Sequence, residues 1–225
     1  MTGRAVSGRI AETFFSIQGE GATAGLPAVF VRLQGCSVGC QWCDTKYSWD
    51  PAHGREVELD ALLGEVAAHP CRRVVITGGE PLESALCVPL LEALYARGYD
   101  VEVETSGTLL PPTSANSTVQ WNVSVKLASA GVLEARRINA GAIRAFLERD
   151  AWWKFVVADE MDLAEVLDLA ARFGLPSQRI LLQPQAVRRE EVLARSPWLI
   201  AACQRHGFRY SPRLHVLLWG ARRGV

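Results

Sequence analysis

The hydrophobic positions of this chain follow two spacings that alternate along its length. Apolar runs typical of strands occupy residues 28–34, 73–77, 100–104, 119–126, 152–158, 179–183 and 213–219, and residues 8–17 mix strand-like apolar positions with polar ones. Between these runs, apolar residues recur three and four positions apart, which predicts helices over 59–67, 86–95, 140–148, 163–170 and 190–205. Residues 46–58 are expected to be irregular and residues 111–118 to form a loop, while 128–139 is poorly defined by its sequence.

Strands separated by helices of this length predict right-handed βαβ units and a parallel sheet. About six such units fit between Val29 and Gln183, with a seventh strand at the tail, whereas a closed barrel needs eight. The fold class is therefore α/β, and we expect a partial parallel β/α barrel of about six strands that is open on one side. Because no repeat, linker or low-complexity stretch divides the sequence, residues 1–225 are expected to form a single domain.

Polar clusters follow the predicted strands directly. They comprise the cysteine-rich stretch 36–43, Gly-Gly-Glu-Pro at 78–81, Glu-Thr-Ser-Gly-Thr at 104–108, Ser-Val-Lys at 124–126 and Gln-Pro-Gln at 183–185. Ligands of α/β sheets and barrels collect at the carboxyl ends of parallel strands, so these clusters should converge on one face. The convergence predicts a single ligand site.

Charge and hydropathy indicate which kind of partner the protein binds and in which compartment it lies. Lys plus Arg and Asp plus Glu are 24 each, so no basic field argues for nucleic acid, and a small molecule is the expected partner. The amino terminus lacks the apolar stretch of a signal peptide, and no apolar run approaches the roughly 20 residues that span a bilayer. We therefore expect a cytoplasmic protein with reduced thiols and without a membrane partner, in which Cys71, Cys87 and Cys203 are buried small hydrophobic residues.

The strongest chemical signal is the spacing C-x3-C-x2-C formed by Cys36, Cys40 and Cys43. A structural zinc site normally takes four protein ligands, whereas a four-iron cluster held by three cysteines keeps one iron open for another ligand. A zinc site would need a fourth ligand, for which His53 or Cys71 is available. Trp42, between two of the cysteines, either shields such a cluster from solvent or belongs to the core.

The other clusters each have two readings. Gly78, Gly79 and Glu80 offer a bare backbone and a carboxylate for an ammonium group, or a plain turn that Glu80 caps. Asp44 and Thr45 offer oxygen ligands for Mg²⁺, or form a turn or a helix cap. The strand-end residues bind a ligand or are solvated: Glu104, Thr105, Ser106, Ser124, Lys126, Gln183 and Gln185.

The cysteine spacing resembles that of radical S-adenosylmethionine (SAM) enzymes, whose open iron chelates SAM so that an electron from the cluster generates a deoxyadenosyl radical. The segment FSIQGEGATAGLPAVFVRLQGCSVGCQWCDTKY is similar to the amino-terminal signature of the 7-carboxy-7-deazaguanine synthase (QueE) family. The resemblance is close over the first 45 residues, and beyond them it rests on the GGEP and ETSGT motifs and on the strand order. Ser-Val-Lys departs from family members that often carry proline in the middle.

The resemblance implies a set of cofactors and residue roles. A 4Fe-4S cluster would sit on Cys36, Cys40 and Cys43, and Mg²⁺ on Thr45. SAM would contact Gly79, Glu80, Glu104, Ser106, Ser124, Val125, Lys126 and Gln183. The pterin substrate would contact Ile17, Gln18, Gly19, Arg32 and Thr77, with Arg32 suited to grip a carboxylate bidentately.

The reaction implied by the resemblance turns 6-carboxy-5,6,7,8-tetrahydropterin into 7-carboxy-7-deazaguanine with loss of ammonia, in queuosine and deazapurine biosynthesis. A flavodoxin-like electron donor and a homodimer are the expected partners. The alternatives are a glycyl-radical-enzyme activase, which shares the cysteine triple and GGEP, and a zinc-stabilised binding module. His215 and the tail 219–225 are placed near the site by analogy, without an assigned role.

Overall fold

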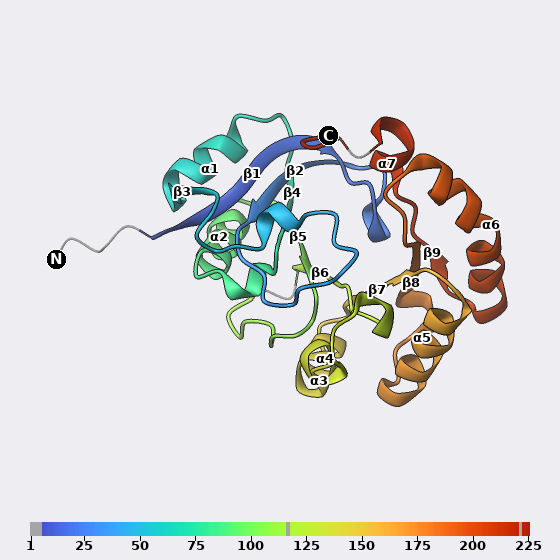
Figure 1. The fold of residues 1–225 in the computed structure, drawn as a ribbon. Helices are drawn as coiled ribbons and strands as arrows, with labels where there is room; N and C mark the ends of the chain where they lie inside the picture. Colours follow the sequence, from blue (N-terminus) through green and yellow to red (C-terminus); the bar gives the residue numbers. More distant parts are fainter. Residues whose placement is uncertain (1–5, 116–117, 221) are drawn as a thin grey trace.

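The computed structural model describes residues 6–115, 118–220 and 222–225, and its framework is one curved sheet. Nine strands of the described residues pair in the order β3-β1-β2-β4-β5-β6-β7-β8-β9 (Figure 1). The strands are β1 (Ser7–Ile17), β2 (Pro27–Leu33), β3 (Arg55–Glu58), β4 (Arg73–Gly78), β5 (Asp100–Thr105), β6 (Gln120–Val123), β7 (Trp152–Val157), β8 (Ile180–Pro184) and β9 (Arg209–Tyr210).

The pairing is parallel from β2 to β9, while β1 lies antiparallel to both β2 and β3 at one end of the sheet. Parallel neighbours end at the same edge, so the loops after β2, β4, β5, β6, β7 and β8 gather there. The prediction of an open, mostly parallel α/β sheet is confirmed.

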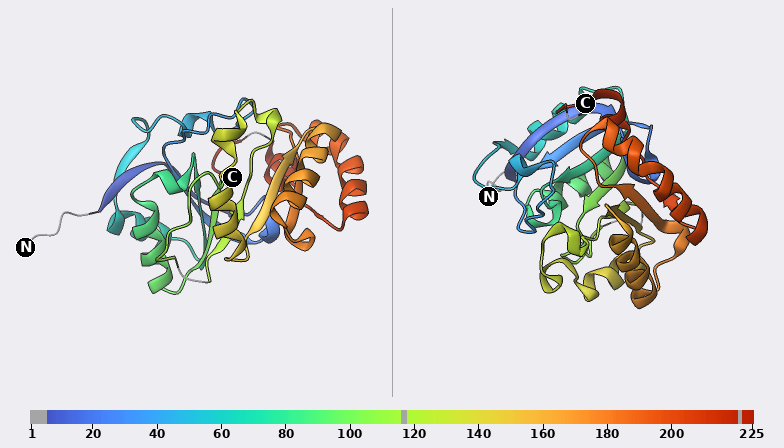
Figure 2. Two further views of the ribbon diagram at one scale, coloured as in Figure 1. Left: turned by 90° about the horizontal axis from the view of Figure 1, so that it is seen from below. Right: turned by 45° about the vertical axis from the view of Figure 1, so that its right-hand side comes forward.

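Helices cover the convex face of this sheet (Figures 1 and 2). They are α1 (Leu59–Ala67), α2 (Cys87–Ala96), α3 (Glu134–Arg137), α4 (Ala140–Leu147), α5 (Glu160–Phe173) and α6 (Arg189–His206). A further helix, α7 (Leu214–Trp219), instead packs beside α6 and against the loop after β1. Single 3-10 turns occur at Gly21–Thr23, Lys46–Ser48, Pro81–Glu83, Ala128–Ala130 and Ser177–Arg179. No helix among the described residues is long and apolar enough to cross a membrane.

Local sequence explains where the longer helices begin and end. The Asp159 carboxylate accepts hydrogen bonds from the backbone N–H groups of Met161 and Asp162 and thereby caps α5. The same helix ends at Gly174, whose φ of 68° lies in the left-handed region that glycine tolerates. α6 continues through Pro197, as the sequence predicts.

Strand residues divide between two faces with a period of two. One set packs beneath the helices in a large core that includes Val74, Trp121, Trp153 and Phe155. The alternate set faces the concave side and is largely polar from Arg32 onwards: Arg32, Thr77, Glu102, Glu104, Asn122, Lys154 and Gln183. This polar inner face positions the site.

Two local predictions were wrong. The apolar run 213–219 is not a strand but contains α7, and the last strand is β9, which the sequence analysis did not predict. Only Val216 of α7 is buried, and Leu218 and Trp219 are 59% and 41% exposed, so the run lacks the burial of a strand core. The segment 46–58, expected to be irregular, ends in β3, whose sequence REVE offers a single buried residue, Val57.

Candidate functional site

A cavity of about 290 Å³ opens at the carboxyl ends of the parallel strands. Fifteen of the residues predicted to bind the cluster, SAM, Mg²⁺ or substrate line it: Ile17, Gln18, Gly19, Arg32, Cys36, Cys40, Cys43, Thr45, Thr77, Gly79, Glu104, Ser106, Ser124, Lys126 and Gln183. The remaining two, Glu80 and Val125, do not line it. Residues far apart in the sequence thus share one wall because five parallel strands, β2, β4, β5, β6 and β8, end at one edge, and the end of β1 adds Ile17, Gln18 and Gly19.

The cysteine loop is fastened to the end of β4 by backbone contacts. The N–H of Gly79 donates to the carbonyl of Leu33 at 3.2 Å, and that of Glu80 donates to the carbonyl of Gly35 at 2.8 Å. A Cβ atom on Gly79 would lie 2.1 Å from the Gly35 oxygen, so only glycine permits this approach. The first of the three cysteines therefore begins its loop directly beside the GGEP motif.

The thiols have surroundings that suit metal-bound sulfur. Trp49 Nε1 donates a hydrogen bond to Cys43 Sγ at 3.3 Å, and Thr45 Oγ1 lies 3.5 Å from the same sulfur. Burial raises the pKa of Cys36, and the N–H groups of Val38 and Gly39 oppose that rise. Three cysteines on one cavity-lining loop, with N–H donors around them, fit a cluster that needs three thiolates.

The residues proposed to complete a zinc site lie elsewhere. Cys71 precedes β4 and its thiol donates to the carbonyl of Pro27, which places it at the opposite edge of the sheet. The side chain of His53 is 74% exposed and pairs with Asp50. Within the described ranges, no three or more His, Cys, Asp or Glu side chains, the loop cysteines included, form a ready-made metal group, so the choice between zinc and a cluster rests on the positions of Cys71 and His53. These positions argue against the zinc-stabilised module.

Glu80 faces inward, where it joins two motifs. Its carboxylate accepts from Thr105 Oγ1 at 2.7 Å, from the Ser106 N–H at 2.7 Å and hydroxyl at 2.5 Å, and from the Leu82 N–H at 3.1 Å. The residue is 1% exposed, so its bonds hold GGEP against the end of β5. Val125 packs in the hydrophobic core, whereas its neighbours Ser124 and Lys126 reach the cavity. There Lys126 Nζ donates a hydrogen bond to Ser124 Oγ at 2.9 Å.

The predicted substrate residues come from three strands. Gln18 and Gly19 follow β1, while Arg32 and Thr77 stand at the ends of β2 and β4. Arg32 Nε donates to Glu12 Oε1 at 2.8 Å, and the Tyr47 hydroxyl donates to the same oxygen at 2.6 Å. Burial would raise the pKa of Glu12, but these two bonds lower it. Arg32 is therefore held in place at the cavity wall, and among the described residues the hydrogen bond of its guanidinium runs through Nε to Glu12.

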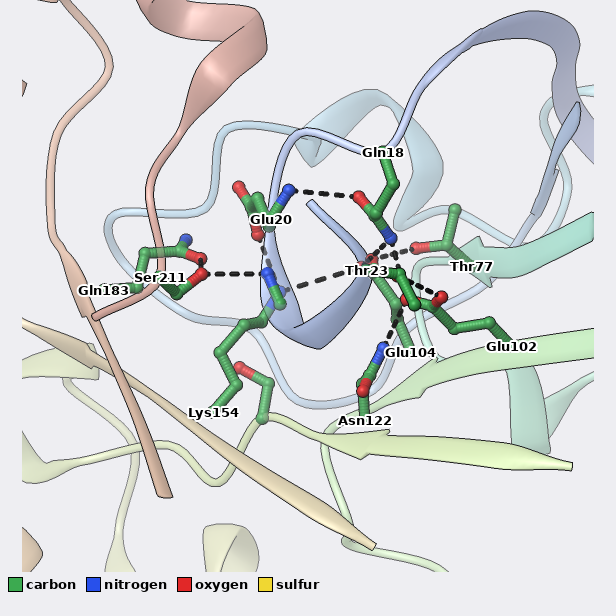
Figure 3. Close-up of polar contacts among 12 residues, drawn as sticks. Gln18, Glu20, Thr23, Thr77, Glu102, Glu104, Asn122, Lys154, Gln183 and Ser211 are labelled. Atoms are coloured by element: carbon green, nitrogen blue, oxygen red, sulfur yellow. Dashed lines mark hydrogen bonds and ion pairs between the residues drawn. The ribbon is translucent and has the colours of Figure 1, made fainter. Parts of the chain in front are cut away.

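A buried charge network that the sequence analysis did not predict forms the other wall. Lys154 Nζ lies 2.6 Å from Glu20 Oε2 and 3.8 Å from Glu104 Oε1 (Figure 3). Arg213 Nε lies 2.9 Å from Glu20 Oε1, and Arg213 Nη2 pairs with Asp44 Oδ2. Burial would raise the pKa of Glu20, but Lys154 and Arg213 hold it well below its usual range. The network ties the loop after β1 to β7, to α7 and to the cysteine loop.

The sequence contained a partial signal for this network. Lys154 interrupts the apolar run WWKFVV, and a cation in the middle of a buried strand requires a partner. His215, placed near the site by analogy, lies beside Gly19, where a Cβ atom would be 2.1 Å from its Nδ1. Arg222, Arg223 and the last two residues also line the cavity, and the Arg223 guanidinium lies 3.5 Å from the Tyr47 ring centre.

The fold and the cavity are those of a radical SAM domain. Residues 30–185 match the family model described as the radical SAM superfamily, and this range contains the cysteine loop, GGEP and every strand from β4 to β8. This class implies a 4Fe-4S cluster and SAM as cofactors, and a small-molecule substrate is consistent with it. The class prediction made from the cysteine spacing is confirmed.

Similarity to known proteins identifies one family within the radical SAM superfamily. The chain is 40% identical to the 7-carboxy-7-deazaguanine synthase of Pyrobaculum aerophilum, with 96% of each chain covered, and 33% identical to that of Escherichia coli K12, with 93% of this chain and 97% of the relative covered. The crystal structure of QueE from Escherichia coli superposes with a TM-score of 0.72 at 30% identity and covers 93% of this chain and 95% of that one. The chain belongs to the 7-carboxy-7-deazaguanine synthase family, as its amino-terminal signature predicts.

Proposed function

We propose that this protein converts 6-carboxy-5,6,7,8-tetrahydropterin into 7-carboxy-7-deazaguanine with loss of ammonia, as the name of its relatives indicates. The observation that carries the proposal is the shared cavity. Residues expected independently to hold the cluster, SAM and the pterin come from six different strand ends and line one space.

In this proposal, Cys36, Cys40 and Cys43 hold the 4Fe-4S cluster through thiolates. When bound, the cluster would supply the electron that cleaves SAM, and SAM would supply the carbon radical that removes a hydrogen atom from the substrate. The chain contributes binding, orientation and exclusion of water. Packing of Cys40 against Val38, Ala130 and Val132 keeps the loop dry on its protein side.

SAM lies, in this proposal, along the ends of β4, β5, β6 and β8. Gly79 offers bare backbone, while Ser106, Ser124 and Lys126 offer hydroxyl and ammonium groups at the cavity wall, with Gln183 opposite. Glu80 serves this site indirectly, because its four hydrogen bonds fix the positions of Ser106 and Gly79. Val125 contributes through the backbone that places its two neighbours.

The pterin lies against Ile17, Gln18, Gly19, Arg32 and Thr77, with Arg32 at its carboxylate. Mg²⁺ is assigned to Thr45, whose hydroxyl lines the cavity two residues after the last cysteine. Since Asp44 already pairs with Arg213, the ion would take its other ligands from substrate oxygens and water. The remaining parts of the proposal are a flavodoxin-like electron donor, a homodimer, a single radical SAM domain over residues 1–225 and a cytoplasmic location.

An anaerobic assay of the reconstituted protein with SAM, dithionite and carboxytetrahydropterin tests the proposal. We expect 7-carboxy-7-deazaguanine to form over many turnovers while SAM is conserved, and the rate to rise when Mg²⁺ is added. A C71S variant is the matched control for a C40S variant, since Cys40 lines the cavity and Cys71 does not. Cleavage of SAM without any deazaguanine product would contradict the proposal.

A further inference from the structure

Glu102 is a carboxylate buried under the substrate side of the cavity without lining it. The residue lies in β5, is 0% exposed and points to the concave face of the sheet (Figure 3). Burial of a carboxylate is costly unless hydrogen bonds compensate for the lost water, so a residue in this position calls for an explanation.

Every group that hydrogen-bonds to this carboxylate is a donor. Gln18 Nε2 donates to Oε1 at 2.8 Å, the Asn122 amide donates to the same oxygen, and Thr23 Oγ1 donates to Oε2 at 2.5 Å. Arg73 lies 3.9 Å from Oε2. Burial and the nearby charge of Glu104 raise the pKa of Glu102, and Thr23, Gln18 and Arg73 oppose that rise. Because all three hydrogen-bonding partners donate, the carboxylate acts as an acceptor toward each of them.

An acceptor-only neighbour decides which way the Gln18 amide points. Its nitrogen must face Glu102, so its oxygen faces the other way, where it accepts from the N–H of Glu20 at 3.2 Å. The second hydrogen on the same nitrogen goes to Glu104 Oε1 at 3.2 Å, and Thr77 Oγ1 donates to the other Glu104 oxygen at 3.1 Å. Gln18 therefore connects the buried carboxylate to the cavity-lining one.

We propose that Glu102 is a positioning residue for the pterin substrate, acting by fixing the direction of the Gln18 amide at the cavity wall. The inference rests on the proposed function, because it takes the cavity beside Gln18 and Thr77 as the pterin site. Reversal of the amide would bring its oxygen against Glu104 and its nitrogen against the N–H of Glu20. Both hydrogen bonds would be replaced by repulsive contacts.

The test compares E102M with T23V, a matched control that removes a bond to the same carboxylate from outside the cavity. E102Q is unsuitable, because its oxygen would still accept from Gln18 and Asn122 while its NH₂ group turned to the Thr23 hydroxyl. E102M has a side chain of similar length and offers Gln18 no acceptor. We expect its dissociation constant for carboxytetrahydropterin, measured anaerobically on the SAM-loaded protein, to rise about tenfold or more, the effect of one lost buried bond to a charged group. The affinity for SAM and its uncoupled cleavage by dithionite should stay within about twofold of the wild type, because Gln18 is assigned to the pterin and not to SAM.

In T23V the Gln18 amide keeps its acceptor, so pterin affinity should stay within about twofold even where thermal stability falls. E102D, which keeps the charge but withdraws it from Gln18, should weaken pterin binding as E102M does and serves if E102M does not fold. Wild-type pterin affinity in a folded E102M or E102D protein would overturn the inference, as would a loss of SAM affinity equal to the loss of pterin affinity. If the wild-type protein itself fails to bind carboxytetrahydropterin, the proposed function fails instead.

Discussion

Replacement of Lys154 by methionine should destabilise the protein strongly, since it removes the cation on which two cavity carboxylates depend. At an effective dielectric constant of 20, attraction to Glu20 at 2.6 Å and Glu104 at 3.8 Å amounts to roughly 6 and 4 kcal/mol. Much of this attraction offsets the cost of burying the ammonium, which methionine does not incur. Loss of one partner of a buried pair costs about 3 to 5 kcal/mol, because the remaining charge is left unpaired.

Thermal unfolding of the reconstituted protein measures this loss. For a chain of this size each kcal/mol lowers the midpoint by about 2 to 4 °C, so K154M should unfold about 6 to 20 °C below the wild type. R55M is the matched control: Arg55 pairs with Glu65 at the surface, where the two side chains are 49% and 36% exposed and such a pair contributes about 0 to 1 kcal/mol. If K154M unfolds at the same temperature as R55M, the buried network does not stabilise this fold and the reasoning is refuted.

Three further predictions follow from the same cavity. Serine at any one cluster cysteine should abolish stoichiometric iron and sulfide binding after reconstitution, while C71S should retain both; iron retention in all three serine variants would contradict the cluster assignment. W49F should lower the reduction potential of the cluster, because the indole N–H bonded to Cys43 Sγ favours the more negative, reduced state; an unchanged potential in an electron paramagnetic resonance titration would exclude that bond from the loaded protein. Glu20 has a lowered pKa and Lys154 a raised one, so their stabilisation is complete above about pH 4.3 and below about pH 10.4 and is lost outside that window. The stability difference between wild type and K154M should therefore stay constant from about pH 6 to 9 and shrink in acid, and a difference that varied across the neutral range would contradict the assignment.

Residue patterns predicted the parallel sheet because apolar runs such as 29–33 and 73–77 are too short for helices and lie between segments with helical spacing. The site was predicted in outline for a related reason: each motif follows a strand, and parallel strands end together. The motif residues could therefore be assigned to one cavity without knowledge of the side-chain packing.

Residues that act across the sheet escaped prediction. Lys154 and Glu102 lie inside strands rather than after them, and their importance depends on partners more than 80 positions away in the chain. Pattern alone also could not separate helix from strand in the run 213–219, where Arg213 turns inward to Glu20 while Leu218 and Trp219 stay exposed. In both cases tertiary contacts, which no local spacing encodes, decided the outcome.

The contact between Gly79 and the carbonyl of Gly35 has a consequence for protein engineering. A designer who transplants only the cysteine loop into another scaffold leaves behind the bare backbone that it rests upon. The smallest portable unit is therefore the pair of adjoining strands with both of their loops, and a foreign host must supply a glycine wherever the second strand meets the graft.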